Sequence, residues 1–163
     1  MKAATRTLLK LAACAAVLAG SATASAQGSA AAAEALFEQG RQDMAAGNFD
    51  AACEKFRQSD KLDPEAVGTR FNLADCEEQR GNFATAWELF KAVEGKVPEG
   101  DERHAIAKAR RESVEPRVPK VTFELAAGAP PGTAVRMGDV ELAASTFGVP
   151  LPLDPGQHEL VVV

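Results

Sequence analysis

Two short stretches of this 163-residue chain, Gly47-Asn48-Phe49 and Gly81-Asn82-Phe83, are identical and lie 34 residues apart. Other residues recur at the same spacing on both sides of them. The recurring pairs are Phe37 and Phe71, Ala52 and Ala86, Phe56 and Phe90, and Pro64-Glu65 and Pro98-Glu99, and small Gly40 is matched by small Ala74. A fixed period of this length indicates stacked structural units. The units are residues 33–66 and 67–100.

Each unit has the pattern of two helices joined by a tight turn. Gly47 and Gly81 stand where a first helix would end, at a position that favours a positive φ angle. Small residues recur where the two helices would cross closely, and the aromatic residue of each shared tripeptide would fill the hairpin. Asp63-Pro64 is typical of a helix start, with an N-cap residue followed by proline. We expect helices at about residues 32–45, 49–62, 64–79 and 83–95.

This pattern resembles the tetratricopeptide repeat family, whose 34-residue units are paired antiparallel helices. The small residue at repeat position 8, the Gly-x-aromatic turn at positions 15–17 and the proline at position 32 all match the family. Other positions depart from it, and they concern the packing of each first helix. The departures are Leu36 and Arg70 at position 4, Gln39 at position 7, and Asp43 and Glu77 at position 11.

A fifth helix is expected over residues 101–115, where Pro116 stops it. Lys108 would take position 8 of a third unit, a place that normally needs a small residue. With Arg111 and Glu112 it forms a polar face. Stacked repeats need a cover over their last apolar face, so we expect this helix to cap a helical domain that spans residues 33–116.

From Val118 onward the helical period gives way to alternation. Val121, Phe123 and Leu125 alternate with polar residues, which is strand spacing. The pattern continues through Val135 and Met137, Val140 and Leu142, Leu151 and Leu153, and His158–Val163, with turn residues at 128–132, 138–139 and 154–156. This spacing predicts about five short strands in a small β-sandwich or meander.

Residues 148–160 read Gly-Val-Pro-Leu-Pro-Leu-Asp-Pro-Gly-Gln-His-Glu-Leu and resemble the PEGA family. That family has a G-x-P-hydrophobic stretch and a Pro-Gly turn followed by His or a similar polar residue. Residues 135–139 would be its first strand and turn, although the usual Asp-Gly order is reversed at Gly138-Asp139. The resemblance implies a PEGA-like β-domain over residues 117–163. The sequence stops at Val163, so either this domain is clipped or the sequence is a fragment. The expected fold class is α+β: two helical hairpins, a capping helix and a small all-β domain.

Residues 1–26 have the pattern of a secretory signal peptide. Three basic residues accompany an apolar stretch at residues 11–20, and Ala24-Ser25-Ala26 supplies the small residues that signal peptidase reads. The apolar stretch is too short to span a membrane. We expect cleavage after Ala26, a mature start at Gln27, a linker over residues 27–32, and a periplasmic or extracellular location.

The stretch Leu11-Ala12-Ala13-Cys14 also resembles a bacterial lipobox, which would attach a lipid to Cys14. Lys10 directly precedes the motif, so almost no apolar residue comes before the cysteine. The lipid anchor is therefore the less favoured alternative.

Cys53 and Cys76 would remain in the mature chain, in an oxidising compartment. They fall in the second helix of the first unit and the first helix of the second unit, which are neighbours in a repeat stack. This placement favours a disulfide over the alternative of two buried thiols.

The charge balance and the motifs exclude several classes of function. The chain carries 18 basic and 23 acidic residues, and phosphate is contacted mainly by Lys and Arg, so a nucleic-acid partner is not expected. No phosphate-binding, nucleophile-elbow or zinc-binding spacing is present in the sequence. We expect a non-enzymatic protein without metal or cofactor. His104 is expected on a solvated helix, His158 in a strand-edge hydrogen bond, and Glu77-Glu78 on a solvated face.

The resemblance to tetratricopeptide repeats implies a protein or peptide partner on the concave face, at positions 2, 5, 9, 12 and 13 of each first helix. These positions hold Glu34, Phe37, Arg41, Met44 and Ala45, then Gly68, Phe71, Asp75, Glu78 and Gln79. Aromatic and arginine side chains are preferred anchors in interfaces. The expected binding residues are Phe37, Arg41, Met44, Phe71, Asp75, Glu78 and Gln79. In the alternative, both Phe side chains pack inward.

Three functions follow from these observations. The first is a protein–protein interaction scaffold of the bacterial cell envelope, with the partner on the concave face. The second is a structural or carbohydrate-associated surface protein, in which the β-domain makes the contact and the helices act as a spacer. The third is an accessory subunit of an envelope enzyme.

Overall fold

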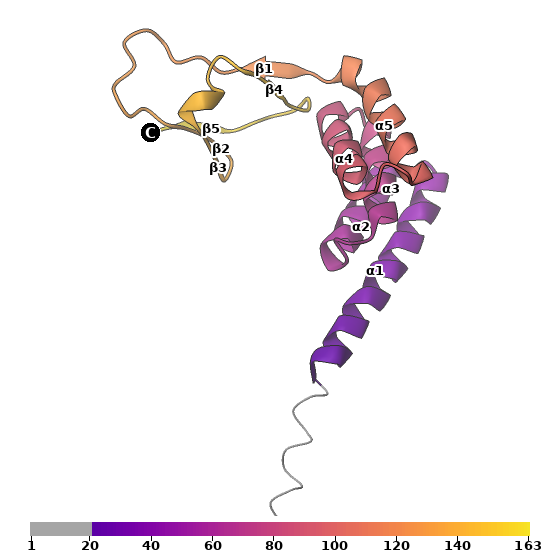
Figure 1. Cartoon of the computed structure of the whole chain (residues 1–163). Coiled ribbons are helices and arrows are strands. Elements are labelled where there is room, and N and C mark those ends of the chain that lie inside the picture. The colour runs from indigo at the N-terminus through magenta and orange to yellow at the C-terminus, as the bar shows by residue number, and fades with distance from the viewer. Residues whose placement is uncertain (1–20) are drawn as a thin grey trace, which may run out of the picture.

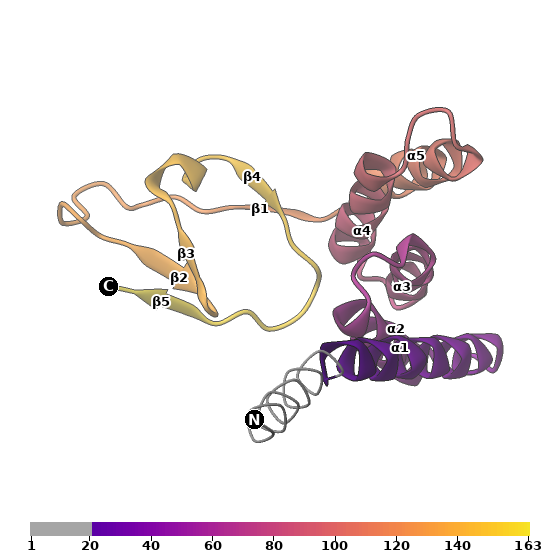
Figure 2. The ribbon, with the colours of Figure 1, turned by 60° about the horizontal axis from the view of Figure 1, so that its bottom comes forward.

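The computed structural model describes residues 21–163 (Figure 1). Five helices lie side by side and five three-residue strands follow them, which is a mixed α+β layout. The basic residues and the apolar stretch expected in the signal segment, with the lipobox cysteine Cys14, lie outside the described residues. In the views of Figures 1 and 2 the strands lie to the left of the helices.

The helices are α1 (Ser21–Ala45), α2 (Phe49–Leu62), α3 (Val67–Gln79), α4 (Phe83–Lys96) and α5 (Glu102–Val114). Helix α1 packs against α2, α2 against α3, α3 against α4, and α4 against α5. The bounds of α2, α4 and α5 agree with the expected bounds to within a residue at each end. Helix α1 begins at Ser21 rather than near residue 32, so residues 27–32, expected as a linker, are helical.

The start of α3 differs from the expectation, because Asp63 does not cap it. Asp63 closes the C-terminus of α2, where its N–H donates to Ser59 O. Its carboxylate accepts a hydrogen bond from Glu65 N at 3.2 Å, which holds Pro64 and Glu65 in a turn. A short polar side chain that bonds the backbone two residues on competes with helix formation. The helix therefore begins at Val67 instead of residue 64.

The turns inside the two hairpins are the same. Gly47 and Gly81 have φ angles of +77° and +82°. In the first turn Asn48 N–H donates to Asp43 O at 2.9 Å, and in the second Asn82 N–H donates to Glu77 O at 2.9 Å. Each glycine N–H also donates to a carbonyl three residues earlier. These paired bonds define a Schellman motif, which ends a helix at a residue of positive φ.

The core of each hairpin surrounds a fully buried phenylalanine of its second helix, Phe56 in α2 and Phe90 in α4. The helices cross closely at the small residues. A Cβ atom on Gly40 would lie 2.8 Å from the Phe56 ring, so α1 has no room for a side chain there. Ala52, Ala74 and Ala86 are fully buried. The requirement for small residues at these crossings is confirmed.

Five strands follow the 3₁₀ turn at Glu115–Arg117. They are β1 (Lys120–Thr122), β2 (Val135–Met137), β3 (Val140–Leu142), β4 (Pro150–Pro152) and β5 (Leu160–Val162). Strands β1 and β4 form an antiparallel pair, and the other three form an antiparallel sheet of order β3-β2-β5. The expectation of about five short strands is confirmed, and all their pairings are antiparallel. The PEGA-like sandwich stays a prediction.

The reversed order Gly138-Asp139 has a structural reason. The two residues form the loop between β2 and β3, and Gly138 has a φ angle of +58°. A two-residue hairpin loop with glycine in its first position fits a type II′ turn, whereas Asp-Gly suits type I′. The order of the two residues therefore matches the turn that the hairpin contains.

Strand β4 carries proline at two positions that face away from β1. Leu153 N–H donates to Pro119 O, so the backbone groups of Leu151 also point toward β1. The backbone nitrogens of Pro150 and Pro152 then point to the open edge of β4, and proline nitrogen carries no hydrogen.

Within residues 21–163, no helix is both long and apolar enough to cross a membrane.

Candidate functional site

The first helices of the repeats, α1 and α3, carry all the residues expected to bind a partner, and α5 lies beyond them. On α1, Phe37 is half-buried, and its ring centroid lies 5.8 Å from that of Phe56. The Arg41 guanidinium carbon lies 5.9 Å from the Phe37 ring centroid, a cation–π contact, and the same group pairs with Glu38 at 3.3 Å. Met44 packs against the buried cluster around Phe56.

On α3, Phe71 has the same arrangement as Phe37. It is half-buried, and its ring meets that of Phe90 edge-on at a centroid distance of 5.3 Å. Both aromatic residues therefore combine the two predicted roles, because each packs on the second helix of its own hairpin and still reaches the surface. Gln79 is exposed at the end of the helix.

Asp75 and Glu78 are held by arginines from outside the repeat pattern. The Arg110 guanidinium of α5 donates to Asp75 at 2.6 Å and to Glu78 at 2.7 Å. Arg117, just after α5, donates to Glu78 at 3.0 Å. Burial raises the pKa of the Asp75 carboxyl, and the nearby Arg110 opposes part of that rise. The two carboxylates thus form a partly buried ion-pair cluster with α5.

An apolar pocket of about 240 Å³ opens beside Phe71, between α3, α4 and α5. Val93 of α4 is buried, and Ile106 of α5 is 44% exposed. The lining residues are Val67, Gly68, Phe71, Asn72, Val93, Arg103 and Ile106. Helix α5 therefore does more than cover the stack, because it supplies one wall of this pocket. We name it the Phe71 pocket.

The binding residues expected from the sequence did not include Ile106, Arg110 or Arg117. Ile106 is an apolar residue on a helix that was expected to present a polar outer face, and this mismatch is the signal that could have identified it. Nothing in the sequence pairs Arg110 with Asp75, because these residues lie 35 positions apart and Arg110 lies outside the two repeat units.

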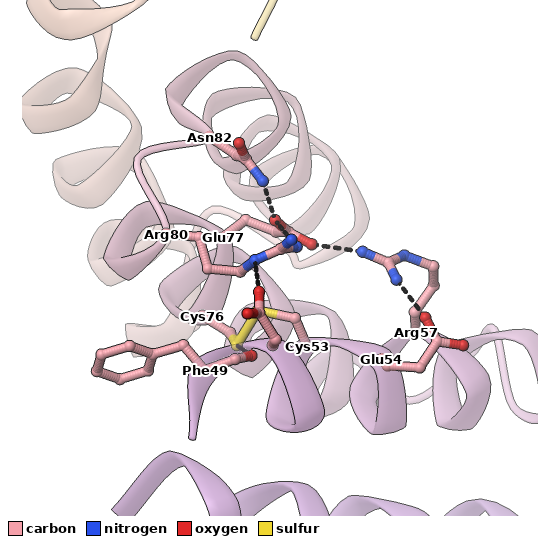
Figure 3. The surroundings of a disulfide bond; sticks show 9 residues. Phe49, Cys53, Glu54, Arg57, Cys76, Glu77, Arg80 and Asn82 are labelled. Atoms are coloured by element: carbon pink, nitrogen blue, oxygen red, sulfur yellow. Dashed lines mark hydrogen bonds and ion pairs between the residues drawn. A yellow bond between two sulfur atoms is a disulfide. The ribbon is translucent and has the colours of Figure 1, made fainter. Parts of the chain in front are cut away.

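Glu77 is not on a solvated face, contrary to the expectation. The residue is 1% exposed, and three side chains hold its carboxylate (Figure 3). Arg57 of α2 donates to it at 2.6 Å, Arg80 at 3.1 Å and Asn82 at 2.7 Å. A buried carboxylate needs such partners. Adjacent residues on a helix do point apart, and here one of them points into the repeat interface.

The disulfide between Cys53 and Cys76 joins α2 to α3 directly beside the Glu77 cluster (Figure 3). Their Cα atoms are 5.6 Å apart, inside the range that a disulfide needs. Both residues are fully buried. The predicted bond is confirmed, and it ties the first repeat to the second.

The two histidines have structural hydrogen bonds. His104 is half-buried rather than solvated, and its Nδ1 lies 3.0 Å from both Glu94 O and Val97 O at the end of α4. His158 Nε2 lies 2.8 Å from Asp154 O, so its bond is to a turn and not to a strand edge. Among residues 21–163, no cluster of His, Cys, Asp and Glu has an arrangement that could hold a metal ion.

Comparison with known proteins found a match to a family model. Residues 43–110 match the family model described as tetratricopeptide repeat. No curated protein matches the chain. Tetratricopeptide repeats generally mediate protein–protein interaction. The matched residues contain α2, α3, α4 and most of α5, with both Schellman turns. The family match and the arrangement of the helical hairpins together support a tetratricopeptide-repeat protein.

Proposed function

We propose that this protein is a non-enzymatic scaffold of the bacterial cell envelope that binds a protein or peptide partner on the face formed by α1, α3 and α5. The observation that carries the proposal is the Phe71 pocket. It is apolar, it lies between α3, α4 and α5, and its walls combine an aromatic ring with the exposed side chain of Ile106. Apolar side chains of a partner gain most when they enter such a pocket.

The other expected binding residues, on α1 and α3, suit recognition of an extended peptide. Arg41, stacked on Phe37, offers an exposed cation on α1, while Asp75 and Glu78 are partly buried carboxylates that already pair with Arg110. Charges of both signs on α1 and α3 favour one register of a bound peptide over others. Gln79 and Met44 would extend the contact toward the hairpin turns.

Two full-length variants test this proposal. Ile106→Asp places a charge in the wall of the pocket without removing a buried side chain, and Val162→Asp places a charge on β5, where Val162 is 67% exposed. Partners captured from envelope extracts should be lost with Ile106→Asp and kept with Val162→Asp. The proposal is wrong if Ile106→Asp captures the same partners as the unmodified chain.

A second candidate function has one observation in its favour. The β-region, residues 117–163, contains an apolar cavity of about 510 Å³, lined by residues that include Phe123, Leu125, Phe147, Leu160 and Val162. In this alternative the β-region makes the contact of a surface protein and the helices act as a spacer. The cavity walls favour apolar groups over the hydroxyl groups of a carbohydrate. The same pair of variants separates the two functions, because only the alternative requires loss of partners with Val162→Asp.

The location proposed for the protein is the periplasm or the outside of the cell. Residues 1–26 support it by their signal-peptide pattern, and a disulfide is compatible with export. Cleavage after Ala26 would leave Gln27 as the first residue of a shortened α1. N-terminal analysis of mature protein should find Gln27, whereas an acylated Cys14 or an intact Met1 would contradict the proposal.

A further inference from the structure

The N-terminus of α4 lacks a cap from its own segment. Asn82 stands at the N-cap position, but its side chain makes no capping bond. Its Nδ2 donates instead to the buried Glu77 carboxylate at 2.7 Å. The first backbone N–H groups of a helix have no partner inside the helix, so those of α4 need an acceptor from elsewhere.

That acceptor is Asp154, in the turn between β4 and β5. Its carboxylate accepts hydrogen bonds from Ala84 N at 2.6 Å and Thr85 N at 3.1 Å, and from the Thr85 hydroxyl. His158 holds the turn by donating to the Asp154 carbonyl. A carboxylate at this place is favoured both as a cap and by the helix dipole. A side chain of the β-region thus completes a helix of the second repeat.

A second contact fixes the near end of the β-region. Arg117 lies between α5 and β1, and its guanidinium carbon is 3.9 Å from the centroid of the Phe83 ring, at the first residue of α4. The same guanidinium donates to Glu78. These two contacts meet near the first turn of α4, and Val118, the next residue after Arg117, packs against the buried cluster around Phe90.

The space around this meeting point is not close-packed. An open cleft of about 610 Å³ lies on one side, between α4 and the Asp154 turn, and includes Glu88, Leu89 and Leu153 in its lining. A smaller cavity of about 240 Å³ lies between Trp87, Val118 and the two prolines of β4. A small polar contact flanked by open space permits relative motion of two parts of a chain.

We propose that Asp154 is a latch that holds the β-region, residues 117–163, in one position against the second repeat. In the closed position the Asp154 carboxylate caps α4. In the open position the carboxylate is solvated, the first turn of α4 loses its cap, and the β-region moves on the segment after α5. The two events are coupled, so whatever holds the β-region away from α4 also loosens the first turn of that helix.

Asp154→Ala in the full-length chain is the main test, with two measurements. Hydrogen exchange at the Ala84 and Thr85 amides should become faster, on the order of tenfold, as expected for loss of a helix cap. Small-angle scattering should show a larger and broader distribution of dimensions, because the β-region is released. Asp139→Ala is the matched control, since Asp139 is an exposed aspartate in the turn between β2 and β3, and it should change neither measurement.

The outcomes separate a latch from a simple cap. Faster exchange with unchanged scattering would mean that other contacts hold the β-region, and it would overturn the latch. No change in either measurement would show that Asp154 does not cap α4 in solution, which also overturns it. Thr85→Ala removes only the hydroxyl contact and leaves an exposed helix position filled. It should shift both measurements in the same direction by a smaller amount, and its failure to do so counts against the latch even if Asp154→Ala does not fold.

Discussion

The two repeats share a backbone but differ in how they neutralise the acid at the end of their first helix. In the first repeat, Asp43 pairs with Lys55 of the same hairpin, which holds the pKa of Asp43 below its usual value. In the second, Glu77 is buried and accepts hydrogen bonds from Arg57 of α2 and from Arg80, the C-cap residue of α3. The first pair stays partly open to water, whereas the second forms part of the interface between the repeats. A repeated sequence thus repeats its turns and helices, while its charges adapt to what is packed next to each copy.

The disulfide between the two repeats is expected to have the largest effect on the free energy of unfolding. Reduction of Cys53–Cys76 should lower the free energy of unfolding by about 3 kcal/mol, as the chain-entropy model gives for a closed loop of this size. Chemical denaturation of the full chain with and without a reductant measures the change. A Cys53→Ala/Cys76→Ala double variant should be insensitive to the reductant. Equal stability of the unmodified chain in both conditions would show that the bond contributes nothing.

Substitution of the buried Glu77 is expected to have the second-largest effect on the free energy of unfolding. Glu77→Gln should lower the free energy of unfolding by about 2 kcal/mol, because the amide cannot satisfy two guanidinium groups in a buried site. Asp43→Asn, its counterpart in the first repeat, should have a smaller effect, since water reaches that pair. The comparison between repeats fails if the two variants are equally destabilised in urea titrations.

A substitution at the crossing of α1 and α2 is expected to have a smaller effect on the free energy of unfolding. Gly40→Ala should lower the free energy of unfolding by about 1 kcal/mol net, because the clash with Phe56 outweighs the better helix propensity of alanine. Gly68→Ala is the matched control, since a Cβ atom at this position of α3 meets nothing within 4 Å. The control should raise thermal stability slightly. A stabilised Gly40→Ala variant would mean that α1 shifts to admit the methyl group.

The smallest expected effect concerns the cap of α5 and its dependence on pH. Asp101 caps α5 through Arg103 N, and its hydrogen bonds with Arg103 lower the carboxyl pKa to about 2 from an ordinary value of 3.8. A lowered pKa in the folded state means that the stabilisation is complete above pH 4 and is lost as the pH falls toward 2. Between pH 5 and pH 2, the melting temperature should therefore fall less for Asp101→Ala than for the unmodified chain. Identical pH dependence of the melting temperature in both proteins would show that Asp101 does not contribute to it.

Much of the helical fold could be predicted because its determinants are local. Gly47 and Gly81 end their helices with a positive φ angle, which depends on the turn alone and not on distant contacts. The spacing of apolar residues predicted the bounds of α2 and α4. The prediction was wrong at Asp63, where a side-chain bond to Glu65 N competes with the cap of α3. Asp-Pro before a helical pattern is consistent with either arrangement, and the sequence alone does not choose between them.

The candidate site could be predicted only in part, for a physical reason. The positions of Phe37 and Phe71 follow from the repeat, so their place on the first helices was predictable. The partners of Asp75 and Glu78 were not, because Arg110 and Arg117 reach them from residues far along the chain. The ion-pair partners of long, flexible charged side chains depend on the tertiary fold, and the spacing of residues in one sequence does not predict them.

The prolines of β4 oppose aggregation of this protein at high concentration. A strand at the edge of a sheet is a template on which another chain can add its own strand, and such growth leads to aggregation. At the open edge of β4, Pro150 and Pro152 offer carbonyl groups without the alternating N–H groups that a new strand needs. The two-stranded sheet therefore ends at β4, and association of one molecule with the next cannot propagate from this edge.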